Sequence, residues 1–354
     1  MRIVSVVGAR PQFVKLAPVA AAAVRAGVEH RVIHTGQHYD QNMSQAFFDE
    51  LDIAAPDVNL EVGSASHGVQ TGRMLAEIEP VLLDVEPDWV LVYGDTNSTL
   101  AAAVAATKVH LRVAHLEAGL RSFNRRMPEE HNRVLTDHAA DLCLAPSEIA
   151  MGHLAAEGLA ERAVLVGDVM ADVLRQTAER VAGDPVDSPV EASSPYVVAT
   201  VHRPDNTDDP ERLAAILGGL AALDRRVFLA AHPRLVAKAA AHGLSLDEGS
   251  ITPVPPLSYP QLVQAVRGAS AVVTDSGGLQ KEAFLLGVPT STLRAETEWV
   301  ETLAGGWNEL VTDFDAIGAS VNRLPPEEPR GHPYGDGHAA DATLEVLIER
   351  AKEL

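Results

Sequence analysis

Short apolar runs alternate with longer amphipathic segments along most of the chain. The runs are rich in valine and leucine, as in residues 2–8 and 88–95, and a segment of helical length follows each. Buried parallel strands joined by helices produce this pattern, because a crossover between parallel strands needs a helix. The sequence therefore predicts an α/β fold of doubly wound parallel sheets. The other expected strand segments are residues 30–36, 111–117, 141–147, 163–168, 196–203, 226–233 and 270–278.

The pattern weakens between about Arg175 and Pro195, where proline and small polar residues replace the apolar period. We expect a linker there, which would divide the chain into an N-terminal domain, 1–172, and a C-terminal domain, 173–338. Residues 341–354 have the pattern of a final amphipathic helix. In doubly wound sheets, ligands bind at the carboxyl ends of the strands, so polar residues that directly follow expected strands are the candidates for a site.

Composition narrows the class of partner. Lys and Arg total 28 and Asp and Glu total 49, which gives a net charge of −21 and argues against nucleic acid or an anionic membrane as partner. The apolar stretches are alanine-rich and far shorter than the roughly 20 residues of a membrane span, and the first residues do not resemble a signal peptide. Cys143 is the sole cysteine, lies in an apolar run and suits a buried structural thiol in a reducing cytoplasm.

The segment GARPQFVK, residues 8–15, follows the first expected strand. Pro11 suits the first helical turn, which would place Arg10 at the strand-to-helix corner and Lys15 about one turn inside the helix. An anion is the natural ligand of such a corner, although a solvated arginine in an ordinary turn explains the residues equally well. The glycines of a GxGxxG fingerprint are missing, which argues against nicotinamide chemistry.

Two acidic residues come directly after expected strands, Asp95 after VLVYG and Glu117 after VAHL. Asp95 can be a helix cap, but this edge of a parallel sheet also presents catalytic carboxylates. In PEEHNR, Pro128 suits a first helical turn, and Glu129 and Arg133 share a helix face.

A surface ladder of ion pairs would explain that face alone. It would not explain why acidic residues also stand at the strand ends that should lie beside this helix. Carboxylates gathered around an anionic ligand have their pKa values pushed apart, which creates acid and base roles from one residue type.

The sharpest motif of the C-terminal half is TDSGGLQKE, residues 274–282. Ser276, Gly277 and Gly278 would allow backbone N–H groups at a helix start to approach a phosphate closely. Glu282, one turn later, can face the diol of a ribose. Glycines also serve tight turns, so the motif has moderate specificity.

TVHRPDN places His202 and Arg203 at another strand end. A histidine there is more often structural, but beside a phosphate cradle it becomes a candidate diphosphate ligand.

With these motifs in view, the chain resembles the non-hydrolysing UDP-N-acetylglucosamine 2-epimerases over nearly its whole length. The motifs occur in the family's order: GARPQFVKLAPV, HTGQHYD, VYGDTNSTLA, HLEAGLRS, MPEEHNRVLTDH, GDVMAD, TVHRPDN, AHPR, TDSGGLQKEAFLLGVP and HPYGDG. The resemblance implies a GT-B-type fold, in which two Rossmann-like domains flank a cleft and the last helix, 339–354, crosses back to the N-terminal domain. It also implies a homodimer, a UDP-sugar substrate, and no cofactor or metal.

The resemblance further implies a reaction. A carboxylate removes the proton from C2 of the sugar while UDP departs from C1 by anti elimination, and UDP re-adds to 2-acetamidoglucal with C2 protonated from the other face. By position the catalytic residues correspond to Asp95, Glu117, Glu129, Arg133 and His202. The substrate and UDP contacts correspond to Arg10, Lys15, Ser276, Gly277, Gly278 and Glu282, with His202 also near the diphosphate.

Two segments depart from the common family pattern. HRPD stands where many members have HRRE, and LRAETEWVETLAGGWN replaces a TERPE segment. Both resemble the branch that includes 2-epimerases of UDP-2,3-diacetamido-2,3-dideoxyglucuronic acid, so this sugar is the alternative substrate. Some members are activated by UDP-N-acetylglucosamine at a second site, although Pro204 replaces an arginine of that site here. The corresponding residues are Gln37, His38, Arg73, Glu130 and His232.

Three other functions remain open from the residues. A GT-B glycosyltransferase would share the fold and the cradle but would need an acceptor groove. A hydrolysing epimerase would release free N-acetylmannosamine, and a nucleotide-sugar binding protein would leave the carboxylates without a role.

Overall fold

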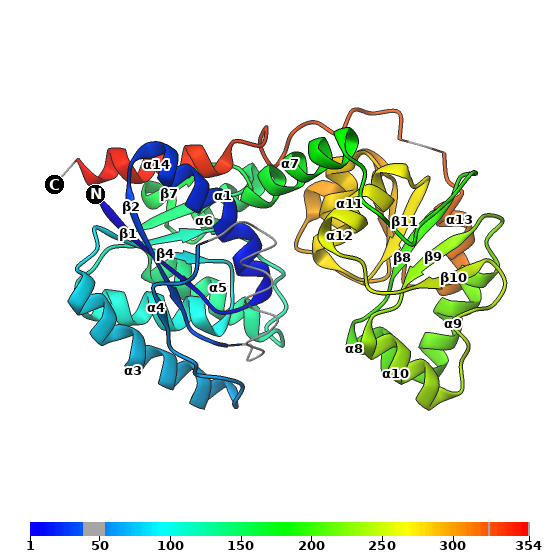
Figure 1. Cartoon of the computed structure of the whole chain (residues 1–354), viewed down its shortest axis with the longest axis horizontal. Coiled ribbons are helices and arrows are strands. Elements are labelled where there is room, and N and C mark those ends of the chain that lie inside the picture. Colours follow the sequence, from blue (N-terminus) through cyan, green and yellow to red (C-terminus); the bar gives the residue numbers. More distant parts are fainter. Residues whose placement is uncertain (38–53, 325, 353–354) are drawn as a thin grey trace. The chain divides into compact units, whose positions relative to one another are not determined.

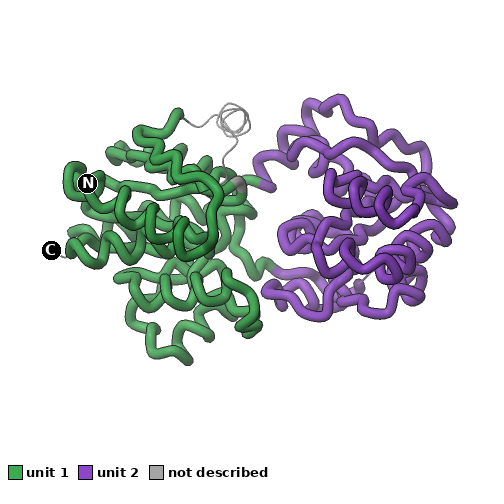
Figure 2. The backbone as a smooth tube through the Cα atoms, turned by 90° about the horizontal axis from the view of Figure 1, so that it is seen from below, with its two compact units in different colours: residues 1–173, 332–354 green, residues 174–331 purple. Residues whose placement is uncertain are grey.

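A computed structural model describes residues 1–37, 54–324 and 326–352 (Figure 1). The chain forms two compact units: unit 1 comprises residues 1–173 and 332–354, and unit 2 comprises residues 174–331 (Figure 2). Each unit holds one sheet in which all described strands pair in parallel. Helices join β1 to β2 and join successive strands from β3 onward. The predicted class, α/β with doubly wound parallel sheets, is confirmed. Among the described residues no helix combines the length and apolar character needed to cross a membrane.

The sheet of unit 1 has seven strands in the order β3-β2-β1-β4-β5-β6-β7. The central strands are buried along their length, as a parallel sheet covered on both faces requires. The order reverses between β1 and β4, so this edge is the switch point at which ligands bind in such sheets. The strands are β1 (Arg2–Val7), β2 (Glu29–His34), β3 (Val58–Asn59), β4 (Trp89–Tyr93), β5 (Val113–Leu116), β6 (Leu142–Ala145) and β7 (Ala163–Leu165).

Two helices of unit 1, α1 and α5, begin where the sequence predicts. Pro11 and Pro128 occupy the first turns of their helices, where the missing N–H costs no hydrogen bond. The described helices are α1 (Arg10–Ala26), α3 (His67–Val85), α4 (Asn97–Lys108), α5 (Pro128–Ala139), α6 (Glu148–Ala156), the 3₁₀ turn η1 (Ala160–Arg162), α7 (Val169–Gly183), which continues into unit 2, and α14 (Ala339–Ala351).

Unit 2 repeats the winding of unit 1, with six strands in the order β10-β9-β8-β11-β12-β13. The switch point lies between β8 and β11, which pair with Thr200 opposite Thr274. The sequence pattern missed β10, β12 and β13. The strands are β8 (Val197–Thr200), β9 (Val227–Ala230), β10 (Ile251–Val254), β11 (Ala271–Thr274), β12 (Thr290–Thr292) and β13 (Asn308–Leu310).

The helices of unit 2 have at most 12 residues each. They are α8 (Pro204–Thr207), α9 (Pro210–Ala221), α10 (Pro233–His242), α11 (Tyr259–Gly268), α12 (Gly277–Leu286), η2 (Val300–Gly306), η3 (Phe314–Ala316) and α13 (Ile317–Val321).

The predicted linker from about Arg175 to Pro195 is wrong in its first half, because α7 continues to Gly183. Leu174, Thr177 and Val181 are buried at helical spacing. Val181 and Leu174 pack with Val263 of α11, and this packing outweighs the weak apolar period of the segment. The remainder, residues 184–195, contains no helix or strand.

The C-terminal helix α14 belongs to unit 1, where it lies alongside α1 (Figure 1). Leu344 and Leu347 join the core of the first sheet, and Trp89 donates its indole N–H to the carbonyl of Leu347 over 3.1 Å. The segment before the helix also packs here: Tyr334 is fully buried and its carbonyl accepts the Asp168 N–H. Residues 332–338 therefore group with unit 1, whereas the sequence pattern assigned them to the C-terminal domain.

Candidate functional site

Asp95 and Glu117 follow neighbouring strands at one edge of the first sheet. β4 and β5 pair in parallel with Tyr93 opposite Leu116, so the segments after them leave the sheet side by side. The structure thus brings both carboxylates to the carboxyl edge of the sheet, beside the switch point.

Lys15 and Glu117 form a buried ion pair at this edge, with side chains 12% and 8% exposed. Lys15 reaches the pair from the second turn of α1. Burial alone would lower the pKa of Lys15, but the charge of Glu117 and its hydrogen bond raise the pKa above its ordinary value. A permanent positive charge therefore stands beside this carboxylate.

The backbone around this pair is strained and tightly packed. Glu117 has φ = 70°, a left-handed conformation that a residue other than glycine adopts only where the surroundings impose it. Gly94 lies against the pair, because a Cβ there would be 3.1 Å from the Lys15 amino group and 3.2 Å from the Glu117 carboxylate. The chain thus holds the pair in place from two strand ends.

Asp95 pairs with Arg133 on α5, and the arginine side chain is 6% exposed while that of Asp95 is 31% exposed. The backbone carbonyl of Asp95 also accepts a hydrogen bond from Asn132 over 2.9 Å. Asp95 is not the cap of the next helix: Thr96 caps α4 and accepts from the N–H of Thr99. Asp95 is therefore free of a capping role and faces α5.

The two acidic residues at the start of α5 differ in environment. Glu129 is exposed, one turn before Arg133. Glu130 is buried and accepts hydrogen bonds from Ser122 N–H at 3.0 Å and Phe123 N–H at 2.9 Å, and it lies 3.3 Å from Arg133. Glu130 thus fixes the loop between β5 and α5, which is a structural contact within unit 1.

At the switch point of unit 2, a buried carboxylate joins two strand ends. Asp275, directly after β11, accepts hydrogen bonds from the N–H groups of His202 and Arg203 and from the side chain of Asn206. Its carboxylate also lies 3.1 Å from Nδ1 of His202, whose side chain is 37% exposed. Asp275 therefore orders the segment after β8 and orients the His202 ring.

The segment predicted to cradle a phosphate lies at the start of α12. Ser276 is the N-cap and accepts from the N–H of Leu279 over 3.3 Å, and Gly277 and Gly278 are the first helical residues. Their position at the positive end of a helix is the usual arrangement of an anion site. Glu282 is buried on the second turn of the same helix.

Sequence reasoning missed Arg294, which lies beside the cradle. Its guanidinium is 5% exposed, pairs with Glu298 over 2.9 Å and has Nη1 buried without a hydrogen-bond partner in the described structure. A Cβ on Gly277 would lie 3.4 Å from that Nη1 and 2.6 Å from the Glu298 carboxylate. Arg294 follows β12, so the rule that found Asp95 would have found it had β12 been recognised.

The residues considered for a second nucleotide-sugar site belong to both units, and one of them lies outside the described residues. Gln37 accepts hydrogen bonds from Ser98 in unit 1, Arg73 is exposed on α3, and His38 lies outside the described residues. His232 belongs to unit 2, where it caps α10 and its ring lies 5.4 Å from that of His202.

Two further predictions concern reactive groups. The backbone of Arg10 begins α1, and its side chain lies outside the described part of the chain. Cys143 is fully buried, and burial raises the pKa of its thiol to about 12, which fits an inert structural thiol. Within the residues that the structure describes, no group of three or more His, Cys, Asp or Glu is arranged to hold a metal ion.

The chain matches the family model described as UDP-N-acetylglucosamine 2-epimerase over residues 20–348. It is 43% identical to a UDP-2,3-diacetamido-2,3-dideoxy-D-glucuronate 2-epimerase of Pseudomonas aeruginosa, over 99% of this chain and 100% of that one. It is also 43% identical to a UDP-N-acetylglucosamine 2-epimerase homolog of Methanococcus maripaludis, over 98% of this chain and 99% of that one.

Among solved structures, the UDP-GlcNAc 2-epimerase of Methanocaldococcus jannaschii in complex with UDP-GlcNAc and UDP resembles this chain with a TM-score of 0.86 and 36% identity. The likeness covers 99% of this chain and 100% of that one. The GT-B-type fold expected from the motifs is thereby confirmed. Agreement of the family model and of relatives over nearly the full length shows that the chain belongs to the UDP-N-acetylglucosamine 2-epimerase family.

Proposed function

We propose that this protein reversibly inverts C2 of UDP-N-acetylglucosamine to give UDP-N-acetylmannosamine without net hydrolysis. The observation that carries the proposal is the pair of carboxylate–cation contacts, Glu117 with Lys15 and Asp95 with Arg133, after adjacent strands of a chain that belongs to this family. Deprotonation at carbon needs a base held in a fixed position, and these contacts fix both carboxylates.

The proposed reaction has two half-steps. A carboxylate takes the proton from C2 while the C1–O bond breaks and UDP leaves with the bonding electrons, giving 2-acetamidoglucal. UDP then adds back to C1, and an acid on the opposite face delivers a proton to C2. Atoms and electrons balance within the substrate and the enzyme's own proton donors.

The two carboxylates suit this chemistry because of their partners. Each carboxylate is held in place by an ion pair with a neighbouring side chain, Glu117 with Lys15 and Asp95 with Arg133. We assign acid and base roles to Asp95, Glu117 and the exposed Glu129, and leave open which carboxylate acts on which face. His202 completes the catalytic candidates as a donor to the leaving diphosphate.

We assign the nucleotide to unit 2 and the reacting sugar to unit 1. Ser276, Gly277 and Gly278 offer helix-start N–H groups to the diphosphate. Glu282 would accept from the ribose hydroxyls, and Arg10 would add positive charge from unit 1.

UDP-2,3-diacetamido-2,3-dideoxyglucuronic acid is the alternative substrate. Its support is specific: the Pseudomonas aeruginosa relative of that name is 43% identical to this chain, whereas the UDP-N-acetylglucosamine 2-epimerase of Methanocaldococcus jannaschii is 38% identical. The reaction at C2 would be the same for both sugars.

Incubation of the protein with each UDP-sugar in D₂O, followed by proton NMR, tests the reaction and the substrate together. UDP-N-acetylmannosamine with deuterium at C2 is the expected product from UDP-N-acetylglucosamine. Deuterium exchange with UDP-2,3-diacetamido-2,3-dideoxyglucuronic acid alone would make that sugar the substrate in place of UDP-N-acetylglucosamine. Free N-acetylmannosamine would indicate a hydrolysing enzyme. No exchange with either sugar would contradict the proposal.

We also propose that the protein works in the cytoplasm as a homodimer. The single cysteine, the buried Cys143, supports the cytoplasmic location. The family resemblance supports the homodimer. Light scattering after size-exclusion chromatography tests the dimer. Activation by UDP-N-acetylglucosamine at a second site that includes Gln37, Arg73 and His232 stays a prediction, for which a sigmoidal rate curve is the measurement.

A further inference from the structure

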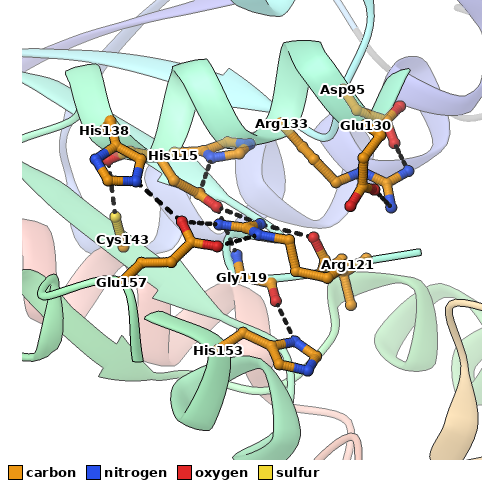
Figure 3. Close-up of polar contacts among 12 residues, drawn as sticks. Asp95, His115, Gly119, Arg121, Glu130, Arg133, His138, Cys143, His153 and Glu157 are labelled. Carbon is orange, nitrogen blue, oxygen red and sulfur yellow. Dashed lines mark hydrogen bonds and ion pairs between the residues drawn. The ribbon is translucent and has the colours of Figure 1, made fainter. Parts of the chain in front are cut away.

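Figure 3 shows a further group of polar side chains in unit 1, which includes His115, Arg121 and Glu157 and lies near Asp95 and Arg133. His115, on β5, and Asp137, on α5, are both fully buried and lie 2.6 Å apart. Arg121, in the loop after β5, contacts Asp137 at 2.7 Å and Glu157, the residue directly after α6. The exposed His138 also contacts Glu157. Asp95 and Arg133 apart, the proposed reaction uses none of these residues.

The hydrogen-bond partners of the His115 ring show which ring nitrogen donates. Nε2 lies 2.7 Å from the carbonyl oxygen of Gly94, which only accepts, so Nε2 carries a proton. Nδ1 lies 2.6 Å from Asp137, whose other oxygen accepts from the N–H of Gly119 and faces Arg121.

Burial would raise the pKa of Asp137, but the neighbouring His115 and Arg121 lower it below its ordinary value. Asp137 is therefore an ionised acceptor that faces Nδ1 of His115, while Nε2 donates to the Gly94 carbonyl.

The two hydrogen bonds of the His115 ring join segments that carry catalytic candidates. Gly94 directly precedes Asp95, and its Cα lies against the Lys15–Glu117 pair. Gly119 comes two residues after Glu117, and Asp137 comes one helical turn after Arg133 on α5. One imidazole thus links the strand end that bears Asp95 to the helix that bears its arginine partner, while Asp137 also holds the loop after Glu117.

We propose that His115 is a positioning residue, which sets the place of Asp95 relative to Glu117 through its hydrogen bond to the Gly94 carbonyl. The inference rests on the proposed function for its consequence in catalysis. A purely structural role, in which His115 only neutralises buried Asp137, is the competing explanation. The two explanations differ in which of the two ring hydrogen bonds matters to the rate.

Asparagine and glutamine separate the two hydrogen bonds. The amide nitrogen of His115→Asn takes the place of Nδ1 and keeps the contact to Asp137, whereas that of His115→Gln takes the place of Nε2 and keeps the contact to Gly94. We expect kcat to fall about 100-fold in His115→Asn and less than about tenfold in His115→Gln, because a displacement near 1 Å at a reacting group costs about that much. KM and the Kd for UDP should stay within about twofold in both.

Two further variants separate rate from stability. Asp137→Asn retains the Gly94 contact, so its kcat should fall less than that of His115→Asn even though Tm falls. Asp172 is a buried carboxylate elsewhere in unit 1 that accepts hydrogen bonds from the N–H groups of Ala339 and Ala340. Asp172→Asn removes its charge and serves as a stability control, for which kcat should be unchanged. If His115→Asn is at least as active as His115→Gln, or if kcat follows Tm across all four variants, the positioning role is refuted.

Hydrogen–deuterium exchange measured by mass spectrometry makes the test independent of the reaction. In His115→Asn the peptide that contains residues 94–97 should exchange at least about tenfold faster than in wild type, with no such change in His115→Gln or Asp172→Asn. Equal exchange in the two His115 variants would overturn the inference. A wild-type protein inactive on both UDP-sugars would contradict the proposed function and leave this comparison to decide the role of His115.

Discussion

The sheets of the two units have the same winding, but different kinds of polar group stand at their strand ends. In unit 1 the ends of β4 and β5 carry Asp95 and Glu117, each paired with a cation from a helix. In unit 2 the ends of β8 and β11 meet at one buried carboxylate, Asp275, which accepts hydrogen bonds from backbone N–H groups. The equivalent edge there offers a helix start and glycines.

The difference shows that topology sets where a site lies, and side chains decide what it does. A strand end in a doubly wound sheet is a place for ligands in either unit. Ionised side chains held by partners suit proton transfer, whereas N–H groups at a helix start suit the binding of a fixed anion. The comparison predicts that changes in unit 1 act on the rate and that changes in unit 2 act on affinity.

Glu117→Gln should have the largest effect. The change keeps the size of the side chain but removes the base, so we expect kcat to fall by about 10³-fold or more while the Kd for UDP stays within about threefold. Deuterium incorporation at C2 and calorimetric titration with UDP are the measurements. Glu77→Gln on the exposed face of α3 makes the same chemical change away from the site and should be silent. A near-normal rate in Glu117→Gln would remove the residue from the catalytic assignment.

Arg294→Met should weaken UDP binding about 30-fold, with a smaller effect on kcat. The change removes a buried positive charge beside Gly277 and leaves Glu298 without that partner, and its carboxylate would repel a diphosphate. Isothermal titration with UDP measures the loss of affinity. Arg267→Met, at an exposed position of α11, is the matched control. Unchanged affinity would show that the cradle works through backbone groups alone.

His30 should make unit 1 sensitive to acid. Burial lowers its pKa from 6.5 to about 4 in the folded chain. Between these values the unfolded chain binds the proton more tightly, so stability is fully present above about pH 6.5 and falls as the pH approaches 4. The shift corresponds to about 3 kcal/mol, and partial exposure reduces this to about 1.5 kcal/mol.

Urea unfolding of wild type and His30→Gln at pH 7 and pH 4.5 tests this point. Wild type should lose more free energy of unfolding than the variant between the two values. Equal losses would mean that other groups govern the acid response.

Cys143 gives the smallest expected effect. Because it is buried and its thiol pKa is raised to about 12, a thiol reagent at pH 8 should leave native protein unmodified and fully active. Absorbance of released thionitrobenzoate measures the reaction, and protein in urea provides the positive control. Rapid modification with loss of turnover would place the thiol near the site.

The sequence predicted best where a local rule applied. Proline in a first turn located the starts of α1 and α5, and the glycines after a serine located the start of α12. It failed at β12 and β13, which have only three residues each and too few apolar positions to show a period. For the same reason Arg294 was missed, since no strand pointed to it.

By itself, the sequence determined the α/β class, the motifs of the family and the strand ends at which chemistry-bearing residues stand. These follow from local propensities and from short spacings that need no knowledge of distant residues. Only the tertiary structure decided the partners: that Lys15 meets Glu117 across the chain, that Glu130 turns to its own loop while Glu129 stays exposed, and that His115 joins Gly94 to Asp137. Such pairings depend on which strands are neighbours and on the direction of each side chain, and both are fixed only when the sheet closes its core.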